Sequence, residues 1–441
     1  MQPDADSACA TLELFSSRLH VPHSDSGTSF RRLHLPTAHK SSPDCNDVLV
    51  EHDHLVERPY FRIGVEHANG KNRSFRHKVI NAYAISIFDC AEIPSRAFYC
   101  QGKSAIPTCD GRYARQAASG TSRHRTRAND RLAWTGLDLL NGEIVPSLTI
   151  LLTTKGCSWA RRDGCTMCGY IADSNPDAQS SDIQKQLFEV LARYGTGFKI
   201  AKLFTSGSFL DQEEVPIDAR DAILSALADT PKVIVESRPE FVTSEILDDV
   251  IRSNRHLEVA IGLETSNDDI RNSCINKGFT FRDFVRASKV AHSKGLTVKA
   301  YLLLKPPFLT ELEALEDAIQ STHDAAPHAD TISLNLCNVQ KGTLVEALWK
   351  KRLYRPPWLW TAVEVLKRVK QMATLICDPV GGGTARGPHN CGKCDRQVVS
   401  EIKEFSLSQD STSFTAACTD QLLWKYVLEF EKFSYGAPLV P

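Results

Sequence analysis

Apolar, β-branched segments alternate with amphipathic segments from about residue 131 onward, and this alternation constrains the fold more than any other feature of the 441-residue chain. The pattern predicts strands at 148–153, 200–205, 232–236, 257–263, 297–304 and 331–336. Helical spacing predicts helices between them, for example at 183–194, 219–228, 281–293 and 311–322. Strands that alternate with helices form parallel sheets. We therefore expect an α/β fold, either an open sheet or a partial, TIM-like (β/α)6 barrel.

Three cysteines follow the first predicted strand. Seven residues separate Cys157 from Cys165, and two separate Cys165 from Cys168. Three thiolates on one loop suit soft iron or zinc. Because a closed structural site normally has four ligands, a 4Fe–4S cluster held by three would keep one iron open for a small molecule. The alternative is a zinc loop that takes a distant fourth ligand.

Polar residues gather at the ends of the other predicted strands, where the chemistry of parallel sheets is usually found. These residues are Ser206, Gly207, Ser208, Glu236, Arg238 and Glu264. The fifth strand also carries Lys299 and Tyr301 within an apolar run. Charges in or beside buried strands are costly unless they are paired or bound to a ligand. Any one of these charged residues could equally belong to a structural ion pair. Their joint placement at one end of the sheet favours a polar ligand pocket instead.

Composition bounds the class of protein. The formal net charge is −1, so no global basic field indicates nucleic acid, and contact with it has to come from local patches. We find no charged-then-apolar leader and no apolar run of about 18 residues, so we expect neither secretion nor a membrane span. Fourteen cysteines without a leader indicate metal ligands and free thiols in a reducing, cytoplasmic compartment.

Residues 1–130 hold nine of the fourteen histidines and show no sustained helical or strand period. They end in an arginine-rich stretch. The first interpretation of this stretch is a solvated linker, and the second is an arm that contacts tRNA. A third interpretation is that residues 1–130 are not native coding sequence. We also expect that this region could be disordered. We assign this region no function.

The C-terminal segment, 346–441, carries a second group of potential metal ligands after a predicted core at 131–345. They are Cys377, His389, Cys391, Cys394 and Cys418. Four of them could close a tetrahedral zinc site, most simply His389 or Cys377 with the other three. A second iron–sulfur cluster and ordinary packed thiols are the alternatives.

The run 350–360 interleaves four cations with three aromatic side chains. Cations can bind phosphates and flat rings can stack on unpaired bases, so the run is a candidate tRNA contact. The alternative is a helix terminus whose tryptophans join the core.

Four motifs resemble the radical S-adenosylmethionine (SAM) superfamily, near its Elongator-type branch. They are the cysteine loop, Ser-Gly-Ser-Phe at 206–209, Glu-Ser-Arg-Pro-Glu at 236–240 and Ile-Gly-Leu-Glu-Thr at 261–265. The C-X7-C-X2-C spacing departs from the common C-X3-C-X2-C. Together with Arg-Gly-Pro-His-Asn-Cys-Gly-Lys-Cys-Asp at 386–395, it resembles the radical SAM subunits of archaeosine synthases. The resemblance covers roughly 131–441.

The resemblance implies a role for each matching residue. Cys157, Cys165 and Cys168 would ligate a 4Fe–4S cluster whose open iron takes the amino and carboxylate groups of SAM. The turn 206–208 would lie beside the methionyl amino group of SAM. The residues that would hold its carboxylate or ribose are Glu236, Arg238 and Glu264.

The resemblance also implies a reaction. A 5′-deoxyadenosyl radical would act on a lysine-modified 7-deazaguanine in the tRNA D-loop, and scission of a C–N bond would leave archaeosine, a lyase-type activity. The implied partners are tRNA, the lysine-transferring subunit of archaeosine synthase and an external electron donor, with no membrane. Rival functions are another radical SAM tRNA-modifying enzyme, a methylthiolase or an Elongator-like one, and a non-catalytic zinc RNA-binding protein.

Overall fold

The computed structural model describes residues 132–369, 373–434 and 437–440, and two short strands upstream. These two strands, β1 (Val48–His52) and β2 (Phe61–Val65), pair antiparallel. They belong to a unit, residues 1–79, that is separate from the unit of residues 80–441. The arginine-rich stretch before residue 131 lies outside the described residues.

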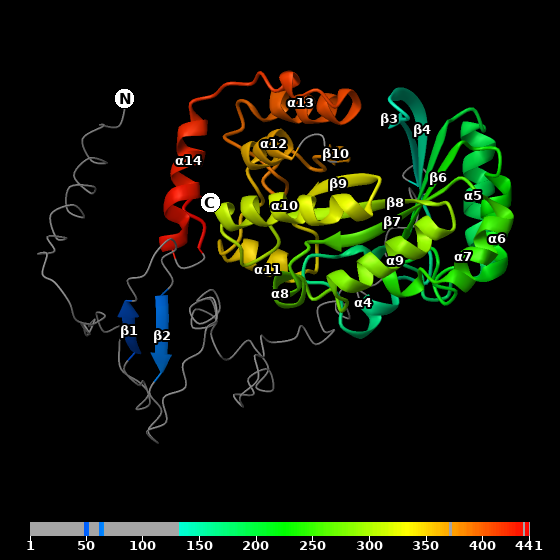
Figure 1. Cartoon of the computed structure of the whole chain (residues 1–441), viewed down its shortest axis with the longest axis horizontal. Coiled ribbons are helices and arrows are strands. Elements are labelled where there is room, and N and C mark those ends of the chain that lie inside the picture. The colour runs from blue at the N-terminus through cyan, green and yellow to red at the C-terminus, as the bar shows by residue number, and fades with distance from the viewer. Residues whose placement is uncertain (1–47, 53–60, 66–131, 370–372, 435–436, 441) are drawn as a thin grey trace, which may run out of the picture. The chain divides into compact units, whose positions relative to one another are not determined.

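A curled eight-stranded sheet forms the centre of the second unit (Figure 1). Its order is β10-β9-β8-β7-β6-β5-β4-β3, with every neighbouring pair parallel except β3 and β4. The strands are β3 (Ala133–Leu140), β4 (Glu143–Leu151), β5 (Ile200–Phe204), β6 (Lys232–Ser237), β7 (Leu257–Glu264), β8 (Thr297–Leu304), β9 (Thr331–Leu336) and β10 (Thr374–Asp378). All six predicted strands are confirmed as β4 to β9, and the predicted α/β partial barrel is confirmed with them.

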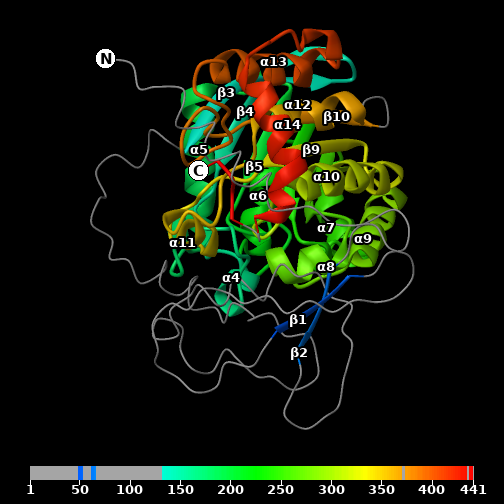
Figure 2. The ribbon, with the colours of Figure 1, turned by 90° about the vertical axis from the view of Figure 1, so that its left-hand side faces the viewer.

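Helices connect the strands and pack consecutively around the sheet (Figures 1 and 2). They are α4 (Ser158–Arg162), α5 (Ser180–Tyr194), α6 (Ile217–Ala226), α7 (Ser244–Ser253), α8 (Asp268–Ile270), α9 (Phe281–Ser293), α10 (Glu311–Ala325), α11 (Leu344–Lys350), α12 (Leu359–Arg368), α13 (Asp395–Ser408) and α14 (Asp420–Phe430). None of the described helices is long and apolar enough to cross a membrane.

Local sequence signals set the starts of these helices. Helix α9 begins with a capping box in which the Thr280 hydroxyl accepts from the Asp283 N–H and the Asp283 carboxylate accepts from the Thr280 N–H. Its buried stripe includes Phe284 and Ser288, as the apolar spacing predicts. The buried Ser288 hydroxyl donates to the Phe284 carbonyl, which satisfies its hydrogen-bonding capacity inside the stripe.

Charged residues inside the sheet are paired. The Glu258 carboxylate on β7 is fully buried and lies 2.7 Å from the Lys232 Nζ and 3.1 Å from the Lys299 Nζ. Burial alone would raise the pKa of Glu258, but Lys299 and Lys232 together hold it at about 2. Lys299 is therefore part of a structural ion pair with Glu258, which is the alternative that the sequence left open for a single charge within a strand.

The C-terminal segment continues the same sheet. Strand β10 pairs parallel to β9, and α13 packs against β10. Residues from 346 onward, which we predicted as a small C-terminal domain, therefore share the sheet of the barrel through this edge strand.

Candidate active site

The three-cysteine loop lies where β4 ends. Cys157 directly precedes α4, and Cys165 and Cys168 follow that helix. All three thiols are partly exposed. Helices α4, α8 and α11 lie at the same end of the curled sheet in both views (Figures 1 and 2). The thiols thus lie at the strand ends, where the parallel sheet predicts chemistry.

Four hydrogen bonds hold the cysteine loop against the segment after β7. The Thr166 N–H donates to the Ile275 carbonyl (2.9 Å) and the Thr166 hydroxyl to the Cys274 carbonyl (2.7 Å). The Asn276 amide donates to the carbonyl of residue 164 (2.8 Å), and the Trp159 indole donates to the Asn276 carbonyl (2.8 Å). The position of the loop is therefore set by residues more than a hundred positions away in sequence.

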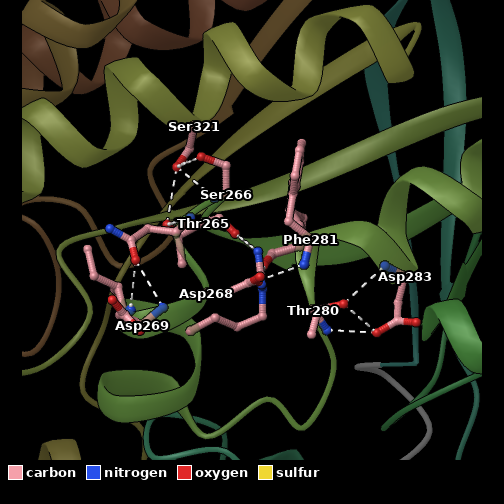
Figure 3. Close-up of polar contacts among 12 residues, drawn as sticks. Thr265, Ser266, Asp268, Asp269, Thr280, Phe281, Asp283 and Ser321 are labelled. Atoms are coloured by element: carbon pink, nitrogen blue, oxygen red, sulfur yellow. Dashed lines mark hydrogen bonds and ion pairs between the residues drawn. The ribbon is translucent and has the colours of Figure 1, made fainter.

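The segment that holds the loop is itself fixed to the barrel (Figure 3). Directly after β7, the Ser266 N–H donates to the Ser321 hydroxyl on α10 (2.8 Å), and the Thr265 and Ser321 hydroxyls lie 3.2 Å apart. Asp268 accepts from the Phe281 N–H (2.7 Å), which ties α8 to the start of α9. These contacts make the wall beside the thiols a rigid support.

The predicted turn Ser206-Gly207-Ser208 approaches the first cysteine very closely. A Cβ at Gly207 would lie 2.6 Å from the Cys157 Cα, so only glycine fits there. The turn is held by the buried Glu214, whose carboxylate accepts from the Ser208 N–H (2.6 Å) and from the Thr154 hydroxyl (2.8 Å). The buried Ser208 hydroxyl accepts from the Arg238 N–H, so its side chain serves the fold. The Ser206 hydroxyl donates to the Tyr170 carbonyl (3.2 Å), so the turn offers a ligand its backbone groups and the accepting capacity of Ser206.

Two cations lie beside the thiols. The Lys277 Nζ is 2.5 Å from the Glu264 carboxylate, and the Arg238 guanidinium lies over the Trp159 ring, 5.1 Å from its centroid. Burial raises the pKa of Cys165 to about 11, and Lys277 and Arg238 act in the opposite direction. Because cations stabilise thiolates, this pair favours the form of the cysteines that binds metal.

Glu236 and Tyr301 line the interior next to this group. Burial raises the pKa of Glu236 to about 7, although its hydrogen bond with Tyr301 acts to lower it. The Tyr301 pKa is also raised by burial and by the neighbouring Glu236 charge. Of the predicted rim residues, Arg238 and Glu264 place charges of both signs close enough to Cys165 to act on its pKa, and Glu236 is hydrogen-bonded to Tyr301.

The donor set suits a cluster better than a single ion. A single metal ion needs at least three ligand atoms close together. Among the described residues, ligand atoms that all lie within 4.8 Å of one another are found at the C-terminal cysteines. The three thiols of the 157–168 loop do not form such a group. In addition to burial, the charge of Cys157 raises the pKa of Cys165, and the charges of Cys165 and Cys157 raise the pKa of Cys168, because like charges nearby disfavour a thiolate. Three spaced thiols on one loop fit an iron–sulfur cluster with a free iron.

The C-terminal ligands divide into two sets. Cys391, Cys394 and Cys418 come together, and the fourth member of their group is Asp420. His389 lies apart, with its Nδ1 2.8 Å from the carbonyl of residue 387, and burial lowers its pKa. Cys377 is buried in β10. The structure brings neither His389 nor Cys377 into the group with the other three cysteines.

The aromatic side chains of 350–360 join the core, as the alternative interpretation of this run predicted. Trp358 and Trp360 are 2% and 4% exposed. Arg355 is also buried, its guanidinium 4.1 Å from the Trp358 ring centroid and bonded to the carbonyls of Pro356 and His389. Lys350, Lys351 and Arg352 are exposed. Base stacking by these tryptophans is therefore excluded, and the exposed cations alone remain for phosphates.

Sequence reasoning missed several residues of the site, because each acts through a distant contact. They are Trp159, Glu214, Lys277 and Asp420. Trp159 and Lys277 flank predicted motifs, but nothing in their spacing shows that they meet. Tyr301, by contrast, was singled out in the sequence as a polar group within an apolar strand.

The site defines a class of protein, and comparisons with known proteins agree. The family model of the Radical SAM superfamily matches residues 151–319. Archaeosine synthase subunit beta of Methanosarcina acetivorans is 50% identical over 319 residues, which cover 70% of this chain and 92% of that protein. The protein of the same name from Thermococcus kodakarensis is 43% identical over 312 residues, with 67% and 96% covered.

The chain therefore belongs to the archaeosine synthase subunit beta family of radical SAM enzymes. Membership implies a 4Fe–4S cluster and SAM as cofactors. Among solved structures, the chain is similar to the archaeal Methanocaldococcus infernus Elp3 with an N-terminal deletion, at 16% identity and a TM-score of 0.38, with 58% of this chain and 59% of that one covered.

Proposed function

We propose that this protein is the radical SAM subunit that completes archaeosine in tRNA, by cleaving a C–N bond of a lysine-modified 7-deazaguanine in the D-loop. The observation that carries the proposal is the three-thiol loop clamped at the strand ends, in a chain 50% identical to an archaeosine synthase beta subunit. Because the relatives are named as subunits, we also propose a complex with the lysine-transferring subunit.

Cys157, Cys165 and Cys168 would hold the 4Fe–4S cluster. With SAM bound, the reduced cluster would supply the electron for radical chemistry on the lysine part of the base. An external donor supplies that electron. The protein itself would position the cluster and SAM. The hydrogen bonds of Thr166 and Asn276 hold the cysteine loop in place for this role.

The rim residues would bind SAM according to charge. Arg238 and Lys277 suit its carboxylate, whereas Glu236 and Glu264 suit ribose hydroxyls or the amino group. The backbone of residues 206–208, packed against Cys157, suits the methionyl end. Closing this pocket around SAM would exclude water from the radical.

Three further assignments complete the proposal. Lys350, Lys351 and Arg352 would contact tRNA phosphates outside the barrel mouth. Zinc, rather than a second cluster, would bind at Cys391, Cys394 and Cys418, whose ligand atoms lie as close together as a single ion requires. A chain with fourteen cysteines, six of them proposed as metal ligands, suits a reducing compartment, and we therefore propose a cytoplasmic enzyme.

The test begins with the cluster. Replacing Cys157, Cys165 or Cys168 by Ala should abolish both the visible absorption of the anaerobically reconstituted cluster and 5′-deoxyadenosine formation. The matched control is Cys377→Ala, which removes a buried thiol on β10 and should leave both intact. A loop variant that still cleaves SAM at the wild-type rate would contradict the ligand assignment.

The substrate is tested separately. Wild-type protein with a chemical reductant should convert tRNA that carries the lysine-modified base, and nucleoside mass spectrometry should detect archaeosine. Free lysine should not be a substrate. If SAM is cleaved but the modified tRNA stays unchanged, the substrate is wrong; if no iron or acid-labile sulfide is bound, the zinc RNA-binding alternative holds instead.

A further inference from the structure

Four ligand atoms in the C-terminal segment, from Cys391, Cys394, Cys418 and Asp420, all lie within 4.8 Å of one another. The Sγ atoms of Cys391 and Cys418 are 3.8 Å apart, and the Cys394 Sγ lies 3.7 Å from an Asp420 carboxylate oxygen. Two sulfurs bound to zinc at about 2.3 Å lie about 3.8 Å apart, and a sulfur and an oxygen about 3.5 Å. A disulfide would require about 2 Å between the sulfurs.

Two helix starts supply these ligands. Cys391 and Cys394 flank the turn before α13, and Cys418 and Asp420 lie at the start of α14. The Asp395 carboxylate fixes the turn, because it accepts from the Asn390 N–H (2.7 Å) and from the N–H of residue 392 (2.6 Å). The ligands are therefore held in place by protein contacts alone, which lowers the entropic cost of binding an ion.

Groups around the ligands orient them. The Trp360 indole N–H donates to the Asp420 Oδ1 (3.2 Å), and the Asn390 side-chain amide donates to the Cys394 Sγ (3.5 Å). Cys394 and Asp420 are buried, whereas Cys391 is exposed. Donors of this kind fix the direction of a carboxylate or thiolate ligand and strengthen metal binding.

We infer that Asp420 is the fourth ligand of a closed Cys3Asp zinc site with Cys391, Cys394 and Cys418, and that the site fastens α14 to the start of α13. Four protein ligands leave no open position, so the ion is structural. The inference rests on the zinc of the proposed function but not on archaeosine chemistry. His389 and Cys377, the fourth ligands that the sequence favours, have no part in it.

Fastening α14 has a consequence at the barrel. The Trp424 indole on α14 donates to the Thr361 hydroxyl on α12 (2.8 Å), and beyond α14 the buried Glu431 accepts from the Glu311 N–H (2.5 Å). The Glu311 carboxylate in turn pairs with Lys305 at 2.6 Å, directly after β8. An ion that fixes the start of α14 thus stabilises the placement of Glu431 in this buried ion cluster.

The experiment measures zinc in the full-length protein. Wild type should carry one zinc per chain, in addition to the iron of the cluster. Asp420→Ala and Cys391→Ala should weaken zinc binding in chelator competition roughly 100-fold or more, about a quarter of the binding free energy of a structural zinc. Asp420→Cys should retain the ion, because a thiolate can replace the carboxylate.

Controls separate the possible fourth ligands. His389→Ala and Cys377→Ala should keep one zinc with unchanged affinity. Asp420→Ala should also make α14 more sensitive to limited proteolysis, while iron content stays at the wild-type value. Wild type without zinc, an Asp420→Ala variant with unchanged zinc affinity, or loss of zinc in His389→Ala would each overturn the inference. Because these assays read metal and proteolysis, they are independent of whether archaeosine is the product.

Discussion

Gly278 offers a sharp test of how the cysteine loop is held. It has a positive φ of +76°, and a Cβ placed there would lie 2.3 Å from the nearest atom of the Trp159 ring. The ring cannot shift freely, because its indole N–H donates to the Asn276 carbonyl and Arg162 lies over its face at 4.6 Å. Gly278→Ala should therefore displace Trp159, two residues after Cys157.

Two costs add up in this variant. A left-handed φ costs a residue with a Cβ roughly 1–2 kcal/mol. Forcing an extra methyl group into a packed contact costs a further 1–3 kcal/mol or so. We expect Gly278→Ala to lower the free energy of unfolding by roughly 2–5 kcal/mol in total.

Gly295→Ala is the matched control. Its φ of +75° is almost the same, but nothing lies within 4 Å of a Cβ there. It should therefore carry only the backbone cost, about 1–2 kcal/mol. Denaturant unfolding measures both variants, and iron per chain after reconstitution shows whether the loop has moved. Equal destabilisation of the two variants, or full iron content in Gly278→Ala, would refute the reasoning.

Three further predictions concern charge. The folded pKa of Glu258, about 2, lies below its ordinary 4.5, so its stabilisation is present above pH 4.5 and is lost as the pH falls toward 2. Glu258→Gln should lose roughly 3 kcal/mol at pH 7, and acid titration of unfolding should show this difference shrinking toward pH 2. Replacing Lys350, Lys351 and Arg352 by Ala should keep the fold, weaken tRNA binding most at low salt and reduce the log–log salt slope by up to about 3; unaltered affinity would exclude this surface. Arg355→Ala should instead destabilise the fold by roughly 2–4 kcal/mol in thermal unfolding, because buried carbonyls lose their donor.

The sequence predicted what depends on local pattern. Apolar, β-branched runs are sufficient to place β4 to β9, and a parallel sheet brings their carboxyl ends to one edge. The spacing of Cys157, Cys165 and Cys168 predicted the ligand loop for the same reason, since all three lie on one short segment. The edge strands β3 and β10 were not predicted; β10 pairs with β9 alone, and its own short sequence does not record that pairing.

Tertiary structure decided which side chains meet. The spacing around Cys391 favoured His389 or Cys377 as a fourth ligand, but α14 brings Asp420 to that place. The sequence pattern placed Arg355 and Trp358 in a candidate tRNA contact, but both side chains are buried in the folded protein. A one-dimensional pattern records which groups are present and how they repeat, because periodicity follows from backbone geometry. It does not record the contacts between segments, because these depend on how whole helices and strands pack.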